Sequence, residues 1–150
     1  MKKCMIGIGM LLVIVAIAAI VLFVTHNDWE TMWEGQNYFY SEDAETESEV
    51  SGGAQFAYDK ERYRKIKLEV NSQIIGSDGT VRIMDVNGKV LKEWEMSGQD
   101  VWEGELEPDL VKEMDTIEMV MNEKKCDGNC HFILYGKEKL SVIIRNLFEE

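Results

Sequence analysis

A run of 20 residues without a charged side chain, from Met5 to Val24, constrains this chain more than any other feature of its sequence. At about 1.5 Å per residue, a helix of this length measures roughly 30 Å, the thickness of the hydrocarbon core of a bilayer. Lys2 and Lys3 precede the run, and no Lys or Arg follows before Lys60. Because basic flanks stay in the cytoplasm, residues 1–27 are predicted to form a cytoplasmic tip and a transmembrane signal-anchor, with the rest of the chain outside.

The same run has a second interpretation as a cleavable signal peptide. Ala16-Ile17-Ala18 has the small-x-small pattern of a cleavage site, and cleavage there would release a secreted chain that begins at Ala19. The apolar run continues past this site, which favours the uncleaved anchor. The predicted location is therefore the cell membrane with a single pass, and secretion is the alternative.

Residues 28–53 combine aromatic and acidic side chains. Trp29 and Trp33 lie just after the apolar run, and Trp side chains favour the headgroup level of a membrane, so both are predicted as membrane-interface residues. A sugar-binding platform or a peptide that docks a partner is the alternative. Five of the eight residues from Glu42 to Glu49 are acidic, too polar to offset the entropy of ordering. We therefore interpret residues 28–53 as an aromatic juxtamembrane segment followed by an acidic flexible stem.

Residues 54–150 show apolar side chains at every second position, as in Ile66, Leu68 and Val70. Turn signals separate these segments, and in Val86-Asn87-Gly88-Lys89 the Asn and Gly suit a type I′ hairpin. The pattern predicts an all-β fold, an antiparallel β-sandwich of about seven strands. It resembles the small tethered or secreted β-sandwich modules of bacterial cell surfaces, a likeness of architecture alone. The predicted core comprises Ile66, Leu68, Val81, Ile83, Met119, Phe132, Leu134 and Val142.

Charge and motif content exclude several functions. The formal net charge is −12, which disfavours nucleic acid as a partner because phosphates require a basic patch. His131 is the only His of residues 54–150, and no nucleophile elbow, phosphate loop or zinc-protease motif occurs. The acidic pairs Glu93 with Glu95 and Glu103 with Glu105 fall on the solvated faces of strands. We therefore expect a non-catalytic protein without a cofactor.

The cysteines fall into two groups. Cys4 precedes the apolar run, on the predicted cytoplasmic side, whereas Cys126 and Cys130 lie in the exported part, where a disulfide can persist. The loop Asp127-Gly128-Asn129 between them suits a hairpin turn, so a Cys126–Cys130 disulfide is predicted. A metal site with His131 is the competing interpretation, and a free or redox-active pair is the remaining one. The metal site lacks a fourth ligand, so no metal is expected.

Trp94 and Trp102 offer the most specific candidate binding site. They flank the predicted turn at Ser97-Gly98-Gln99, either as core residues or as an outward platform for a sugar ring. The favoured prediction is a membrane-anchored, extracytoplasmic β-sandwich module that binds a protein or an envelope component. A carbohydrate-binding module using Trp94 and Trp102 is the alternative, and an envelope hydrolase is a weaker one. The oligomeric state stays open.

Overall fold

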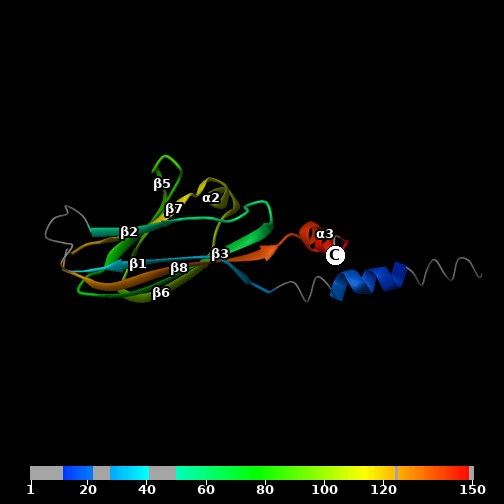
Figure 1. Ribbon diagram of the computed structural model, residues 1–150, viewed down its shortest axis with the longest axis horizontal. Helices are drawn as coiled ribbons and strands as arrows, with labels where there is room; N and C mark the ends of the chain where they lie inside the picture. The colour runs from blue at the N-terminus through cyan, green and yellow to red at the C-terminus, as the bar shows by residue number, and fades with distance from the viewer. Residues whose placement is uncertain (1–11, 22–27, 41–49, 124, 149–150) are drawn as a thin grey trace, which may run out of the picture.

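The computed structural model describes residues 12–21, 28–40, 50–123 and 125–148. Residues 12–21 form a helix whose side chains are all exposed, and it lies beyond one end of the β-domain (Figure 1). Within the described ranges, no helix is both long enough and apolar enough to cross a bilayer. The predicted transmembrane helix is therefore not found, and residues 5–11 and 22–24 of the predicted span lie outside the described part of the chain.

The described residues from Glu30 onward form a two-layer antiparallel β-sandwich, which confirms the predicted fold class. One sheet has the strand order β1-β8-β3-β6 and the other β2-β7-β4-β5, with every pair antiparallel. Within the described residues the strands number eight, one more than the predicted seven. In chain order the elements are β1 Glu30–Phe39, β2 Val50–Gln55, β3 Tyr63–Ile75, β4 Gly79–Met84, β5 Val90–Met96, β6 Gln99–Glu105, α2 Pro108–Glu113, β7 Thr116–Met121, β8 Asp127–Glu138 and α3 Leu140–Phe148.

The core lies between the two sheets, where alternation places the apolar side chains. Seven of the eight predicted core residues have exposed fractions of 3% or less. Val142 is the exception, because it lies in α3 and not in a strand. Residues 140–144 are rich in β-branched side chains, as strands are, but they belong to a helix.

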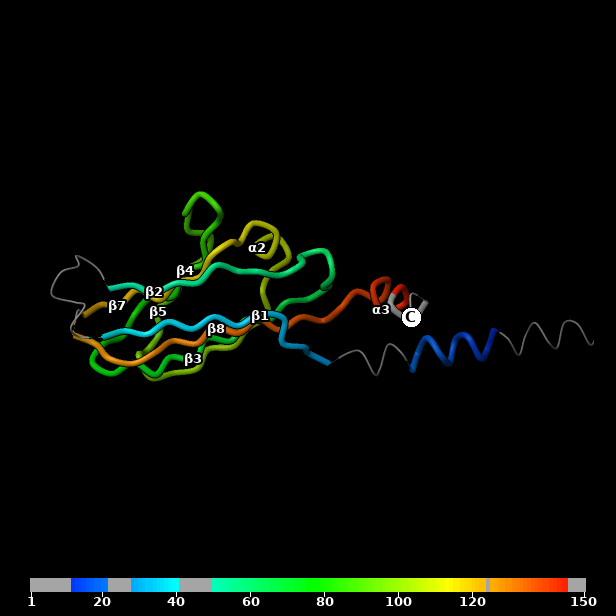
Figure 2. The backbone as a smooth tube through the Cα atoms, viewed as in Figure 1, coloured from blue at the N-terminus to red at the C-terminus, as the bar shows by residue number. Residues whose placement is uncertain are grey.

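The two strands nearest the N-terminus correct the predicted domain boundary. β1 lies within the segment interpreted as juxtamembrane and pairs with β8, while β2 crosses the predicted boundary at residue 54 and pairs with β7. The β-domain therefore begins at Glu30. Most of the acidic stem, residues 41–49, lies outside the described residues. Figure 2 shows β1 and β2 running along the two layers on the same side of the sandwich.

The β4–β5 hairpin forms at the predicted residues but with a different turn. Only Gly88 has a positive φ, 78°, and Asn87 does not, so the turn is not of type I′. The Gly88 N–H donates to the Asp85 carbonyl, and the Asp85 carboxylate accepts from the N–H groups of Asn87 and Lys89. This arrangement fits a type I turn closed by a glycine bulge.

Candidate functional site

The long strands β3 and β8 give the sandwich two distinct ends. Their antiparallel register pairs Tyr63 with Glu138 at one end and Ile75 with Asp127 at the other. At about 3.3 Å per residue, the 13 residues of β3 separate these ends by roughly 40 Å. We call the end with α3 and the start of β1 the proximal end, and the end with the β3–β4 loop the distal end (Figure 1).

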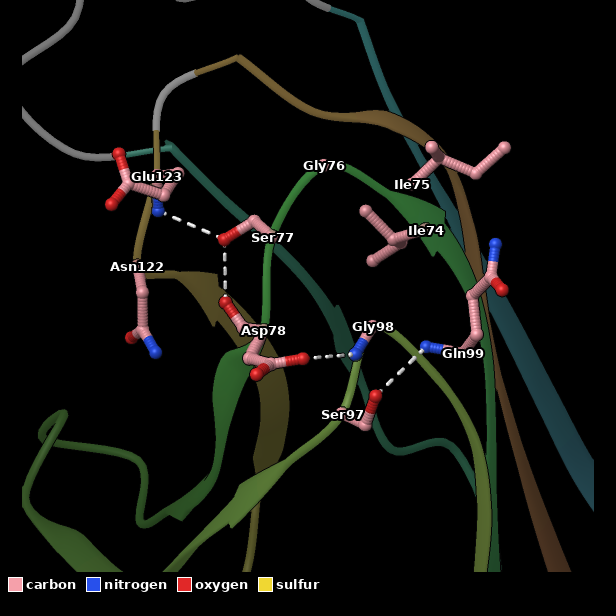
Figure 3. Close-up of a pocket in the computed structure, with 10 residues that line it drawn as sticks. All are labelled: Ile74, Ile75, Gly76, Ser77, Asp78, Ser97, Gly98, Gln99, Asn122 and Glu123. Atoms are coloured by element: carbon pink, nitrogen blue, oxygen red, sulfur yellow. Dashed lines mark hydrogen bonds between the residues drawn. The ribbon is translucent and has the colours of Figure 1, made fainter.

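The distal end carries a shallow depression of about 630 Å³, formed by the β3–β4 loop, the β5–β6 turn and the end of β7 (Figure 3). The Asp78 carboxylate accepts a hydrogen bond from the Gly98 N–H at 3.1 Å, which joins the loop to the turn. The Ser77 hydroxyl donates to the Asp78 carbonyl and accepts from the Glu123 N–H at 2.8 Å, which adds the segment after β7. Three separate segments of the sequence are thereby fixed around one opening.

Gly98 permits the close contact between these segments. A Cβ at this position would collide with the Ser77 carbonyl oxygen and would lie 2.6 Å from that of Ile74. The Gly98 carbonyl in turn accepts hydrogen bonds from the Ile74 N–H and the buried Ser72 hydroxyl, both at 2.7 Å. The floor of the depression is therefore a rigid backbone network.

The rim of the depression offers polar groups for a partner. Among the described residues, the side chains of Gln99, Asn122 and Glu123 make no hydrogen bond, so their amide and carboxylate groups face solvent unengaged. Ile75 is 66% exposed beside them. Amides, a carboxylate and one apolar side chain suit a hydrogen-bonding ligand such as a peptide or a glycan.

Trp94 and Trp102 pack against each other at the opposite long side of the sandwich from β1 and β2. Trp94 pairs with the buried Val81 and Trp102 with the buried Val70, so alternation turns both rings toward the interior from the edge strands of the two sheets. The ring centroids are 4.5 Å apart with an interplanar angle of 36°, and both rings are half-buried against the core. The rings meet between the sheets and do not form an outward platform. Sugar binding by this pair stays a prediction without support from its orientation.

Trp29 and Trp33 both contact residues of the β-sandwich. Trp33 belongs to β1 and packs edge-on against Phe56 with the ring centroids 4.9 Å apart. Trp29 lies at the proximal end, and the ammonium groups of Lys137 and Lys67 lie 4.8 Å and 5.4 Å from its ring centroid. The role of both residues at a membrane interface stays a prediction.

The predicted disulfide is contradicted. Cys126 and Cys130 are free thiols, 1% and 0% exposed. No hairpin separates them, because residues 127–138 form one continuous strand. Four residues of extended chain span roughly 13 Å, well beyond the 4.4 to 6.8 Å between Cα atoms that a disulfide requires. Burial raises the pKa of both thiols, that of Cys130 to about 12.

The structure does not bring the other candidate residues into a reactive cluster. Cys130 faces the core, whereas His131 faces outward with its Nε2 3.6 Å from the Glu34 carboxylate. Across the described ranges, no group of three His, Cys, Asp or Glu side chains could hold a metal ion. The carboxylates of Glu103 and Glu105 form ion pairs with lysines of β3 on the solvent-exposed face of their sheet.

The sequence alone does not indicate the distal depression. Ser77-Asp78-Gly79 and Ser97-Gly98 are predicted there only as turns. Nothing in their local sequence indicates that they meet, because the contact depends on two sheets packing face to face. A turn that carries two or more hydrogen-bonding side chains is the signal that could flag them.

No family model matches the chain, and no curated protein matches it. A pilus protein of Bacillus endospore appendages shares 8% identity over 75% of this chain and 94% of its own, with a TM-score of 0.42. The Tobacco streak virus coat protein shares 12% identity over 70% and 86%, with a TM-score of 0.37. The capsular polysaccharide assembling protein CapF from Staphylococcus aureus shares 12% identity over 75% and 25%, with a TM-score of 0.34. Likenesses this remote carry no functional argument.

Proposed function

We propose that this chain is a membrane-anchored, non-catalytic β-sandwich module that presents its distal end outside the cell to a protein or another envelope component. The observation that carries the proposal is the surface of the helix at residues 12–21. Its seven large apolar side chains are each between 53% and 65% exposed. Burying one such side chain fully is worth about 1.5–3 kcal/mol, so this helix requires an apolar environment around its whole circumference.

A lipid bilayer is the environment that covers a helix on all sides. The uncharged run Met5–Val24, of which this helix is the middle, has the length of a membrane span. Lys2 and Lys3 favour an N-terminus in the cytoplasm and a sandwich outside. Secretion after cleavage at Ala18 is the alternative that the experiment below must distinguish.

The distal end is the part that such an anchor leaves free for a partner. The chain enters the sandwich at the proximal end, so the depression of Figure 3 lies roughly 40 Å farther from the membrane. Its unengaged Gln99, Asn122 and Glu123 side chains supply hydrogen-bonding groups. Of the paired carboxylates that could serve acid–base chemistry, Glu103 and Glu105 form ion pairs on an open strand face.

The anchor is tested with the full chain expressed in bacterial cells. We compare Ile14→Lys/Ile17→Lys with the matched variant Ile14→Leu/Ile17→Leu. A Lys near the centre of a span costs about 2.5–3.5 kcal/mol, so two should move the chain out of carbonate-washed membranes, while the Leu pair stays. Equal membrane retention of both variants, or a native chain that begins at Ala19 in the medium, would contradict the anchor.

The binding end is tested by site-specific photocrosslinking in the same cells. A photoreactive residue in place of Gln99 should yield a discrete adduct. The matched control in place of Val86, 77% exposed on the β4–β5 hairpin, should not. Adducts of equal yield at both positions, or none at position 99, would remove the distal end as the binding surface.

A further inference from the structure

The C-terminal helix leaves the sandwich at the same end as the N-terminal helix. Glu30, the first residue of β1, pairs with Gly136 near the end of β8, and α3 follows at Leu140. Figures 1 and 2 both place α3 and the helix of residues 12–21 beyond the proximal end. A chain anchored through its N-terminal run therefore also brings α3 to the membrane.

The first residues of α3 are fixed to the sandwich. The Lys139 N–H donates to the Arg62 carbonyl at 2.9 Å, and the Arg62 guanidinium pairs with the buried Glu138 carboxylate. The N–H groups of Val142 and Ile143 then donate to the Lys139 carbonyl as the helix begins. The direction of α3 at its start is thus set by the end of β8.

One side of α3 is apolar and incompletely covered. Five of the six apolar residues of α3, at 140, 143, 144, 147 and 148, have the spacing of a single helical stripe, with Val142 and Arg145 away from it and Ser141 at its edge. Ile143 is 5% exposed, but Leu140 and Ile144 remain 40% and 42% exposed. None of the three belongs to the core cluster between the sheets.

The surroundings of α3 match the headgroup region of a bilayer. Lys137 lies over the Trp29 ring, and Trp side chains favour this depth. Neither Lys137 nor Arg145 forms an ion pair with any described residue, so both cations are available to anionic lipid. Juxtamembrane cations of this kind are attracted to anionic bilayer surfaces.

We propose that α3 lies in the interface of the same bilayer that holds the N-terminal anchor, with Leu140 and Ile144 inserted among the lipids. This inference rests on the proposed anchor and extends it. Two contacts, one spanning and one interfacial, hold the sandwich in a defined orientation with its distal end away from the membrane. A single flexible tether would leave the sandwich free to tumble.

The test uses the full chain with Cys4→Ser, bound to vesicles of phosphatidylcholine and phosphatidylglycerol. A polarity-sensitive fluorophore is attached to Ile144→Cys, with Leu140→Cys as a second reporter. Ser141→Cys at the edge of the apolar stripe of α3 is an intermediate position, and Ile75→Cys at the distal end is the control. Cys126 and Cys130 are buried and should stay unlabelled in the folded chain.

We expect brominated lipid to quench the labels at 144 and 140 several-fold more than the label at 75. Iodide in solution should quench the label at 75 most and the labels at 144 and 140 least. With both quenchers, the label at 141 should give an intermediate result. Quenching at 144 and 140 that equals that at 75 in vesicle-bound chain overturns the inference and leaves the anchor standing. Labels at 144 and 140 that neither quencher reaches also overturn it, because a protein then covers the stripe. A chain that does not bind vesicles at all overturns both proposals.

Discussion

At the scale of single residues, Trp94 and Trp102 close one open side of the sandwich. Their rings pack against each other between the edge strands of the two sheets, with the ring centroids 4.5 Å apart. Trp102→Ala should therefore lower the free energy of unfolding by about 2–4 kcal/mol, and Trp102→Phe by clearly less because a ring remains. Urea denaturation followed by circular dichroism measures both. Equal stability of Trp102→Ala and the native chain would mean that the pair does not support the fold.

Cys130 makes stability depend on alkaline pH. Burial raises the pKa of its thiol from 9.0 to about 12, so between these values the unfolded chain loses a proton that the folded chain keeps. Stability should fall as pH rises through this window, by up to about 1.4 kcal/mol per pH unit. Burial also raises the pKa of Tyr58, which acts in the same direction at high pH. The measurement is urea denaturation from pH 8 to about 11.

The control for this pH effect is Cys130→Ala. This variant should be less stable at neutral pH, because it leaves a cavity, but its stability should fall less steeply with pH. An unchanged slope would assign the alkaline instability to other groups.

Residue burial could be predicted wherever alternation was strict. Leu68 and Val81 are buried as expected because their neighbours in sequence are polar and fix the register. The state of Cys126 and Cys130 could not be predicted, since Asp127-Gly128-Asn129 has the composition of a turn. Those residues instead extend β8, with Gly128 at a φ of 145° between Phe39 and Ile74 on the flanking strands.

At the scale of elements, β1 and β2 are the strands that the sequence pattern does not predict. β2 reads Val-Ser-Gly-Gly-Ala-Gln, with one large apolar residue. Its glycines are required by close packing: a Cβ at Gly53 would lie 2.9 Å from the Ile117 carbonyl oxygen, and one at Gly52 would lie 2.9 Å from Asn37. A strand of such small residues carries no hydrophobic period, so a pattern search interprets it as a linker.

The domain boundary is tested by two truncations. A chain of residues 28–150 should unfold cooperatively, whereas a chain of residues 54–150 should not. The shorter chain loses β1 and most of β2, leaves one edge each of β8 and β7 unpaired, and lacks the buried Phe39 and Val50. Thermal melts and near-ultraviolet circular dichroism distinguish the two. Cooperative unfolding of residues 54–150 would show that residues 28–53 are a stem after all.

α3 shows how a short apolar segment can mislead. Leu140 to Ile144 is rich in β-branched residues and is as long as a strand, so composition favours one. The structure forms a helix instead, and five of its six apolar residues, at 140, 143, 144, 147 and 148, have its period. Five residues are too few to distinguish the two-residue period of a strand from the 3.6-residue period of a helix. The nine residues of α3 are enough.

At the scale of the whole molecule, the sequence was sufficient to predict the class of fold. It was not sufficient to predict which features lie at which end of the long axis. Two antiparallel sheets follow from alternation and turns. The distal depression requires Ser77, Asp78, Gly98 and Glu123 to meet, and only the packing of the two sheets brings these residues together. The pairing of β1 with β8 is likewise what places both terminal helices at one end.

The central claim is that this chain is fixed in a membrane with its sandwich outside, and cysteine accessibility in intact cells tests it most directly. In the variant Ile75→Cys, the new thiol lies at the distal end at a position that is 66% exposed. A membrane-impermeant maleimide should label this new thiol in intact cells and should reach Cys4 only after the cells are permeabilised. Labelling at position 75 that requires permeabilisation, or recovery of the labelled chain in the soluble fraction, would contradict the account.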